Sequence, residues 1–427
     1  MRLVPFALAA FASLAVMQAP VGRAETVVTP RAVIDGYAEL ALAKYADSLA
    51  AARELEAAVD ALLAEPTKAR HEAAKAAWLD ARVPYQQTEA YRFGNPVVDA
   101  WEGRVNAWPL DEGLIDYVDT SLYGEMSEEN GAFLANVIAN ASFIVGGRTV
   151  DAGEITPELL RGLHEIDGVE ANVATGYHAI EFLLWGQDLN GTGPGAGRRP
   201  HTDFDPANCT GGSCERRGRY LAAAAKLLVA DLQEIVAAWD EGGRARAELA
   251  AQSDAQGLAS MLTGLGSLSY GELAGERMQL GLILHDPEEE HSCFADNTHN
   301  DHYFDALGIR NVYLGRYERR DGTVVEVPSL SALTAAIDPA LDETLRGRLD
   351  ATMAAMSVLK RRADDGIEAY DQMIAFGNEA GNAVVQDAID ALVAQTRGLE
   401  SLVAALGSAE IAVEGSDSLD APSAVFE

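Results

Sequence analysis

The chain has 427 residues, and its 66 acidic residues outnumber its 32 Lys and Arg residues, giving a formal net charge of −34. This charge argues against nucleic acid and anionic membranes as partners and favours cations. The length exceeds what one small core needs, so we expect two domains.

The first 24 residues have the pattern of a signal peptide. Arg2 supplies the charge, an apolar run extends from Leu3 to Val16, and the small residue Ala24 suits cleavage before Glu25. No later run approaches the eighteen apolar residues of a membrane span. We therefore expect the mature protein to be soluble and exported, and not an integral membrane protein.

Helical periodicity dominates the first half of the mature chain. Thr29 and Pro30 suit an N-cap and a first helical position, so a long helix is predicted over 30–64. A second helix is predicted over 69–93, with a bend at Pro84, before an irregular stretch at 101–117. Further helices are predicted over 127–142, from Thr156, and over 176–186, 215–239 and 253–285, with a Gly- and Pro-rich loop at 187–213.

The second half continues with a polar loop over 286–305 and a hairpin within 313–327. Helices resume at 331 and 339 and reach 406, and an acidic, disordered tail is predicted over 407–427. The order of elements resembles a weak internal repeat. We predict an all-α fold of two related helical bundles, residues 25–200 and 201–406, with a small β-hairpin in the second half.

The three cysteines suggest one pair. Cys209 and Cys214 lie five residues apart in a Gly-rich loop and could close a small disulfide in an oxidising compartment. Cys293 is left over.

Two reactive side chains share one face of the helix predicted at 176–186. His178 and Glu181 are three residues apart, within an apolar run that includes Phe182 and Trp185. An imidazole and a carboxylate can supply two ligands to iron, manganese or zinc. The same pair can equally be a buried hydrogen-bonded contact. Gly176, at the start of the run, would allow another segment to approach closely.

Acidic residues of the first half are candidates for the remaining ligands. They are Glu89, Asp111 and Asp116. Two of them have a structural alternative: Glu89 could pair with Arg82 or Arg92, and Asp111 could cap a helix.

The stretch from 285 to 302 is a second candidate site. Four of the eight histidines fall within these eighteen residues, beside six acids. Such density suggests a cation or ligand site, although capping and backbone hydrogen bonds could also use these groups. The candidate residues are His285, Glu289, His291, Asp296, His299, Asp301 and His302.

The sequence has no motif for several other kinds of catalytic or nucleotide-binding site. It contains no Gly-x-Ser-x-Gly, no His-Glu-x-x-His zinc motif, no phosphate-binding glycine loop and no dinucleotide fingerprint.

Three stretches resemble the imelysin family, described as insulin-cleaving metallopeptidases, and within it the iron-regulated protein A branch. They are Gly176–Glu181, which matches the pattern Gly-x-His-x-x-Glu, and the longer stretches 105–113 and 289–299. The resemblance implies two related helical bundles, export to the periplasm or outer cell surface, and a link to iron uptake. It also implies that His178 and Glu181 lie in the metal motif, joined by Glu89 and by Asp111 or Asp116.

Three functions follow as hypotheses. The first is an exported metal-binding protein that holds iron, with zinc as the alternative, and serves a membrane iron-uptake component. The second is a metallopeptidase using the same motif, for which the sequence offers no independent catalytic base. The third is a metal-free module that binds a peptide, haem or a partner protein.

Overall fold

The computed structural model describes residues 28–426, so the signal peptide predicted over 1–24 lies outside the described residues. The described chain is built from helices, with two small antiparallel hairpins, which confirms the all-α prediction. Within this range, no helix is long and apolar enough to cross a membrane.

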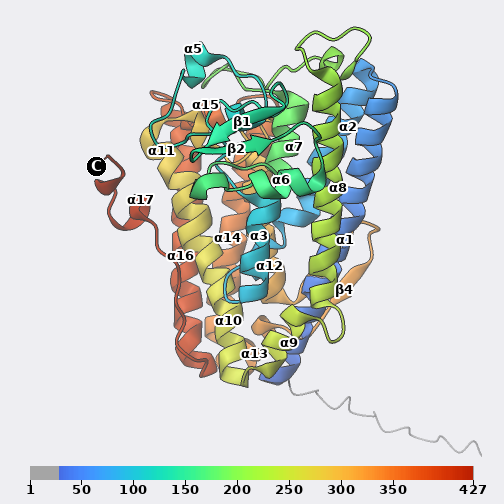
Figure 1. The fold of residues 1–427 in the computed structure, drawn as a ribbon. Helices are drawn as coiled ribbons and strands as arrows, with labels where there is room; N and C mark the ends of the chain where they lie inside the picture. Colours follow the sequence, from blue (N-terminus) through green and yellow to red (C-terminus); the bar gives the residue numbers. More distant parts are fainter. Residues whose placement is uncertain (1–27, 427) are drawn as a thin grey trace, which may run out of the picture.

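Three long helices stand side by side along the molecule (Figure 1): α1 (Pro30–Ala64), α2 (Lys68–Gln86) and α8 (Cys214–Trp239). The shorter helices α3 (Pro96–Asn106), α7 (Gly176–Trp185) and α9 (Arg244–Ala251) pack against α8. α1 begins where the sequence predicts because the Thr29 hydroxyl accepts a hydrogen bond from the N–H of Ala32. α8 follows the boundary predicted at residues 200 and 201, yet it packs against α1, α3 and α7 of the first half.

The second bundle begins with a rod of three consecutive helical segments. They are α10 (Asp254–Ser267), a π-helix η4 (Leu268–Gln279) and α11 (Leu280–Leu284). Around this rod lie α12 (Thr298–Leu314), α13 (Leu330–Ile337), α14 (Pro339–Asp364), α15 (Tyr370–Ile374) and α16 (Glu379–Leu406). This bundle has an apolar core of its own, which includes Leu273, Met356 and Ile389. α12 packs against both α14 and α2, so it joins the two bundles.

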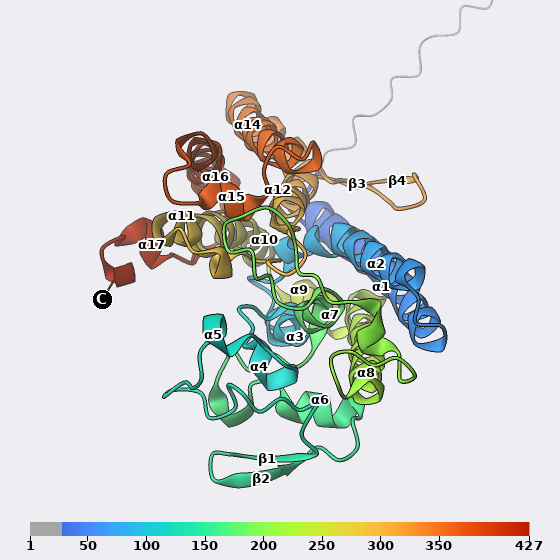
Figure 2. The same ribbon diagram turned by 90° about the horizontal axis from the view of Figure 1, so that it is seen from above.

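Short elements lie together on one side of the long helices in the view from above (Figure 2). They are α4 (Glu112–Ile115), α5 (Thr120–Tyr123), β1 (Ser142–Val145), β2 (Arg148–Asp151) and α6 (Pro157–Leu163). The 3₁₀ turns are η1 (Glu89–Tyr91), η2 (Ile166–Gly168), η3 (His201–Phe204) and η5 (Pro287–Glu289). The predicted hairpin within 313–327 is confirmed as β3 (Arg316–Glu318) paired with β4 (Val324–Glu326).

The prediction of a helix over 127–142 is wrong. Side chains hold this stretch in turns instead: Ser127 accepts from the N–H of Asn130, and Asn130 accepts from that of Ala132. Such local bonds compete with helix formation. The stretch then enters hairpin β1–β2, which the sequence analysis missed. Two other boundaries differ, because α3 extends into the predicted irregular stretch and α12 begins inside the predicted polar loop.

The tail beyond α16, predicted to be disordered, is instead held against the second bundle and runs back along it (Figure 1). The Glu414 N–H donates to the Ser267 hydroxyl at 3.1 Å, and the Ser418 hydroxyl donates to the carbonyl of Gly275 at 3.0 Å. The tail ends in α17 (Asp417–Asp420) and the turn η6 (Ala424–Phe426). Its polar side chains are used for contacts with η4, which composition alone does not reveal.

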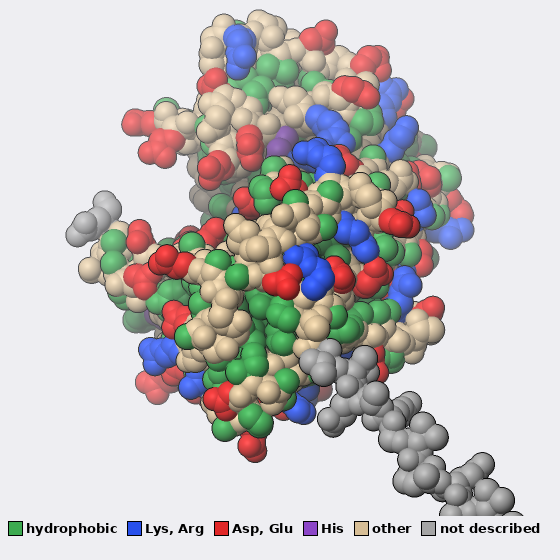
Figure 3. Space-filling model, turned by 90° about the horizontal axis from the view of Figure 1, so that it is seen from below, with side chains coloured by type: hydrophobic (Ala, Val, Ile, Leu, Met, Phe, Trp, Pro, Cys, Tyr) green, Lys and Arg blue, Asp and Glu red, His purple; other side chains and the backbone are tan. Residues whose placement is uncertain are grey.

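Two surface features complete the fold. Cys209 and Cys214 form the disulfide that their spacing suggested, and Cys293 is a free thiol. On the face at the opposite end of the molecule (Figure 3), acidic and basic side chains are interspersed. The excess negative charge is therefore not gathered into one patch on that face.

Gly176 sets how closely α7 approaches α3. Its φ is +82°, and a Cβ atom at this position would lie 2.4 Å from the carbonyl oxygen of Val105. A residue with a side chain does not fit there. The close approach expected at Gly176 is therefore confirmed, and it fixes the start of the helix that carries His178.

Gly176→Ala is expected to lower the free energy of unfolding by about 2 kcal/mol, through the clash and the left-handed backbone. Denaturant unfolding followed by circular dichroism measures the change. The matched control is Gly162→Ala in α6, where a Cβ meets nothing within 4 Å. That control should be neutral or gain about 0.5 kcal/mol. An equal loss in both variants would contradict the role of Gly176.

Candidate functional site

His178 lies in the first turn of α7 and is 1% exposed. Its Nδ1 is 2.8 Å from one carboxylate oxygen of Glu181, whose other oxygen accepts a hydrogen bond from the N–H of Ala295. Burial holds the pKa of His178 well below its usual value and the pKa of Glu181 well above. Glu181 thus orients the imidazole, and neither of its oxygens is free.

His291 repeats this arrangement from the other bundle. It is also 1% exposed, and its Nδ1 is 2.9 Å from the carboxylate of Asp301 on α12. The guanidinium of Arg82 on α2 holds both oxygens of Asp301, at 3.2 and 3.1 Å. The hydroxyl of Ser292 also donates to Asp301.

Burial and the neighbouring charges determine the protonation state of His291. Burial alone would raise the pKa of Asp301, but the charge of Arg82 and the bond from His291 hold it well below its usual value. Burial, assisted by the positive charge of Arg277, lowers the pKa of His291 to about 3. His291 is therefore a neutral imidazole beside an ionised carboxylate. The carboxylate accepts a hydrogen bond from Nδ1–H, so the lone pair of the ring is on Nε2.

The two imidazoles meet. Their ring centroids are 4.7 Å apart and the rings are nearly perpendicular. Among the residues described, neither Nε2 has a hydrogen-bond partner, although both are buried. Both rings line one cavity of about 600 Å³. The two sites that the sequence suggested separately, around His178 and in the stretch 285–302, thus meet in one place.

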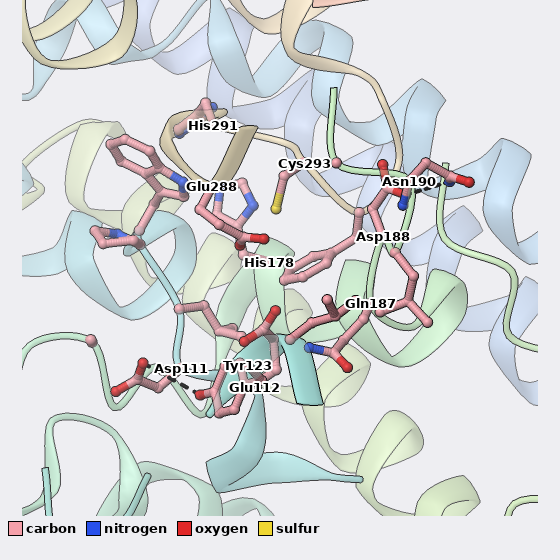
Figure 4. Close-up of a pocket in the computed structure, with 18 of the residues that line it drawn as sticks. Asp111, Glu112, Tyr123, His178, Gln187, Asp188, Asn190, Glu288, His291 and Cys293 are labelled. Carbon is pink, nitrogen blue, oxygen red and sulfur yellow. Dashed lines mark hydrogen bonds between the residues drawn. The ribbon is translucent and has the colours of Figure 1, made fainter. Parts of the chain in front are cut away.

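Acidic and apolar side chains make up the rest of this cavity (Figure 4). His178, His291, Glu288 and Cys293 lie on one side of it in that view, and Asp111, Glu112 and Tyr123 on the other. Burial, with the nearby charge of Glu288, raises the pKa of Glu112 to about 8. No Lys or Arg is among the described residues that line this cavity, so its carboxyl groups have no cationic neighbour within it.

Two of the predicted ligands lie elsewhere, in ion pairs with arginine. Glu89 is buried and bonded to Arg277 at 3.0 Å, so its partner is neither of the arginines that the sequence suggested. Asp116 is buried between Arg199, at 2.7 Å, and Arg217, at 2.6 Å. The structure does not bring these two carboxylates to His178.

Asp111 lines the cavity, but both of its carboxylate oxygens already accept hydrogen bonds. It occupies the N-cap position of α4, as the alternative reading proposed, yet its side chain makes no capping bond. Its carboxylate instead accepts hydrogen bonds from the amide of Asn130 and the hydroxyl of Tyr123.

The remaining candidates from the stretch 285–302 are dispersed. The ring of His285 donates to the carbonyl of Ile374, and His299 accepts from the amide of Asn300. His302 is buried edge-on against Tyr370. Glu289 lies at an outer groove lined by the tail, and Asp296 occupies a left-handed turn position. Only His291 and Asp301 of this set join His178 and Glu181.

Sequence reasoning missed Arg82 as the residue that fixes His291. It considered Arg82 only as a partner for Glu89. A signal was present, since Arg82 lies one helical turn from the buried Trp78 and Gln86, and a buried arginine requires a carboxylate partner.

The site offers few ready ligands. Across residues 28–426, no three His, Cys, Asp or Glu side chains are gathered so that they could hold a metal ion. The arrangement therefore supplies two oriented imidazole donors that face an acidic cavity.

The sequence and the fold of this chain are similar to those of known proteins. The family model described as imelysin matches residues 41–399. Iron-regulated protein A from Synechococcus elongatus is 30% identical over 104 residues, which are 24% of this chain and 29% of that protein. The chain therefore matches less than a third of that relative's length.

A solved structure, named as a candidate iron-regulated protein A precursor from Parabacteroides distasonis, has the same fold. It superposes with a TM-score of 0.64 at 20% identity, covering 90% of this chain and 97% of the other. Because the imelysin model matches well over half of the sequence, the chain belongs to the imelysin family.

Proposed function

We propose that this protein is exported and binds a metal ion between His178 and His291, as part of iron uptake. The observation that carries the proposal is the pair of buried Nε2 atoms without hydrogen-bond partners, both at one cavity. Leaving such polar atoms unpaired is costly unless a ligand or water meets them. We propose iron as the metal, with zinc as the alternative, since imidazole suits both.

The carboxylates behind the rings support this proposal. Metal-binding histidines commonly donate their other N–H to a carboxylate, which fixes the ring and strengthens the ligand. Glu181 and Asp301 are in that position. A cation at Nε2 would also provide the positive charge that the buried carboxylate of Glu181 lacks. In this proposal Glu181 is a positioning residue, whereas the sequence suggested a ligand.

The other support comes from the cavity and from the relatives. Acidic side chains at the cavity would concentrate cations near the rings. The relatives are named iron-regulated protein A, and one of them is named a precursor, in keeping with the leader expected over 1–24. A membrane iron-uptake component would then receive the metal.

His178→Ala and His291→Ala should each weaken metal binding by more than about 100-fold, because each removes one of two imidazole donors. Calorimetric titration of the purified protein with Fe²⁺ without oxygen, and with Zn²⁺, measures this. His299→Ala is the matched control, since its ring lies outside the cavity, and it should bind like the unmodified protein. Equal binding by all four proteins would contradict this site, and a purified protein that binds neither metal would favour a metal-free binding module.

Glu181→Gln should weaken metal binding by about 10–100-fold, less than His178→Ala, because the amide keeps the shape but cannot become the carboxylate that accepts the Nδ1–H of a metal-bound His178. The same titrations measure the loss, and the thermal unfolding midpoint shows whether the variant is folded. A loss as large as that of His178→Ala would instead make Glu181 a direct ligand. Peptide cleavage that a chelator abolishes would favour the metallopeptidase alternative.

A further inference from the structure

We infer a second cation site, made of carboxylates alone, next to the imidazole pair. A small cavity of about 10 Å³ adjoins the imidazole cavity and shares Glu112, Asp188 and Glu288 with it; five acidic side chains line it. They are Glu112, Asp188, Glu288, Glu290 and Asp371. A cavity of that size holds about one water-sized occupant, so the space suits a single ion and no larger ligand.

Two of the five carboxylates have no partner in the described part of the chain. Glu290 is 1% exposed and Asp371 is 2% exposed, and none of their four oxygens has a hydrogen-bond partner. Burial, with the nearby charge of Asp371, raises the pKa of Glu290 well above its usual value. Burying an unpaired carboxylate is costly. No Lys or Arg is among the described residues lining this cavity.

The donor set specifies the class of cation. All five groups offer carboxylate oxygens, which are the ligands of hard cations, and Ca²⁺ takes six to eight oxygens in a flexible shell. Mg²⁺ demands a stricter octahedron and gives up water reluctantly. The residues come from separate segments, α4, the loop after α7, the turn at η5 and α15. Such an adaptable set suits Ca²⁺, with Mn²⁺ as a spectroscopic substitute.

The carboxylates are close but not yet gathered at coordination distance, as the absence of any metal-ready group of three in residues 28–426 shows. Binding would therefore draw the side chains inward. Neither His178 nor His291 is among the residues that line this small cavity. Glu290 and Asp371, the two unpartnered members, do not line the cavity that holds the imidazoles, so the inference does not rest on the proposed function.

The double variant Glu290→Gln with Asp371→Asn tests the inference, because it keeps both shapes and removes both charges. Ca²⁺ should bind the unmodified protein with a dissociation constant of about 1 mM or tighter, and raise its thermal unfolding midpoint. The double variant should bind Ca²⁺ at least about tenfold more weakly. Without metal it should be no less stable than the unmodified protein, because it no longer buries two unpaired carboxylates.

Two further variants distinguish binding at this site from binding elsewhere on the protein. His178→Ala should retain the response to Ca²⁺, which distinguishes this site from the imidazole pair. Glu128→Gln with Glu129→Gln removes two exposed charges near α5 and controls for the general negative charge. Mn²⁺ binding followed by electron paramagnetic resonance gives a readout independent of stability. No binding of Ca²⁺ or Mn²⁺ to the unmodified protein, or equal binding to the Glu290/Asp371 double variant, would overturn the inference.

Discussion

The buried ion pair between Arg82 and Asp301 is the contact on which the site depends. Arg82 comes from α2 in the first bundle and Asp301 from α12 in the second, and both side chains are fully buried. Removing one partner of such a pair costs about 3–5 kcal/mol, because the other charge is left uncompensated. The guanidinium also lies over the ring of Tyr177, next to His178. One arginine therefore links the two bundles and, through Asp301, fixes the imidazole of His291.

The same device recurs away from the cavity. Arg277 binds Glu89 and Asp305, while Arg199 and Arg217 enclose Asp116. Two of the acids in these ion pairs, Glu89 and Asp116, were predicted from the sequence to be metal ligands. Burial keeps both rings neutral, and the charges of Arg82 and Arg277 add to that effect. No Lys or Arg is among the described residues that line the cavity, so its acidic side chains face the rings without a cationic neighbour there.

The sequence predicted what local signals determine. Thr29 with Pro30 marked the start of α1, the apolar period marked α7 and α8, and Gly176 marked a close approach that the structure confirms. It failed over 127–142, where turn-forming Ser and Asn side chains outweigh a helix-like pattern. The meeting of His178 with His291 had no local signal, because it depends on how two bundles pack. An acid's partner is likewise a property of packing, as Glu89 illustrates.

The placement of the two rings on different bundles bears on residence time. A ligand held only by α7 could leave after that helix frayed, but one held by both rings is a crosslink between the bundles. Separating α7 from the segment before α12 would break one of its two bonds, and the buried ion pair between Arg82 and Asp301 opposes that separation. A receiving protein that widened the gap between the bundles would accelerate release without competing for the imidazoles.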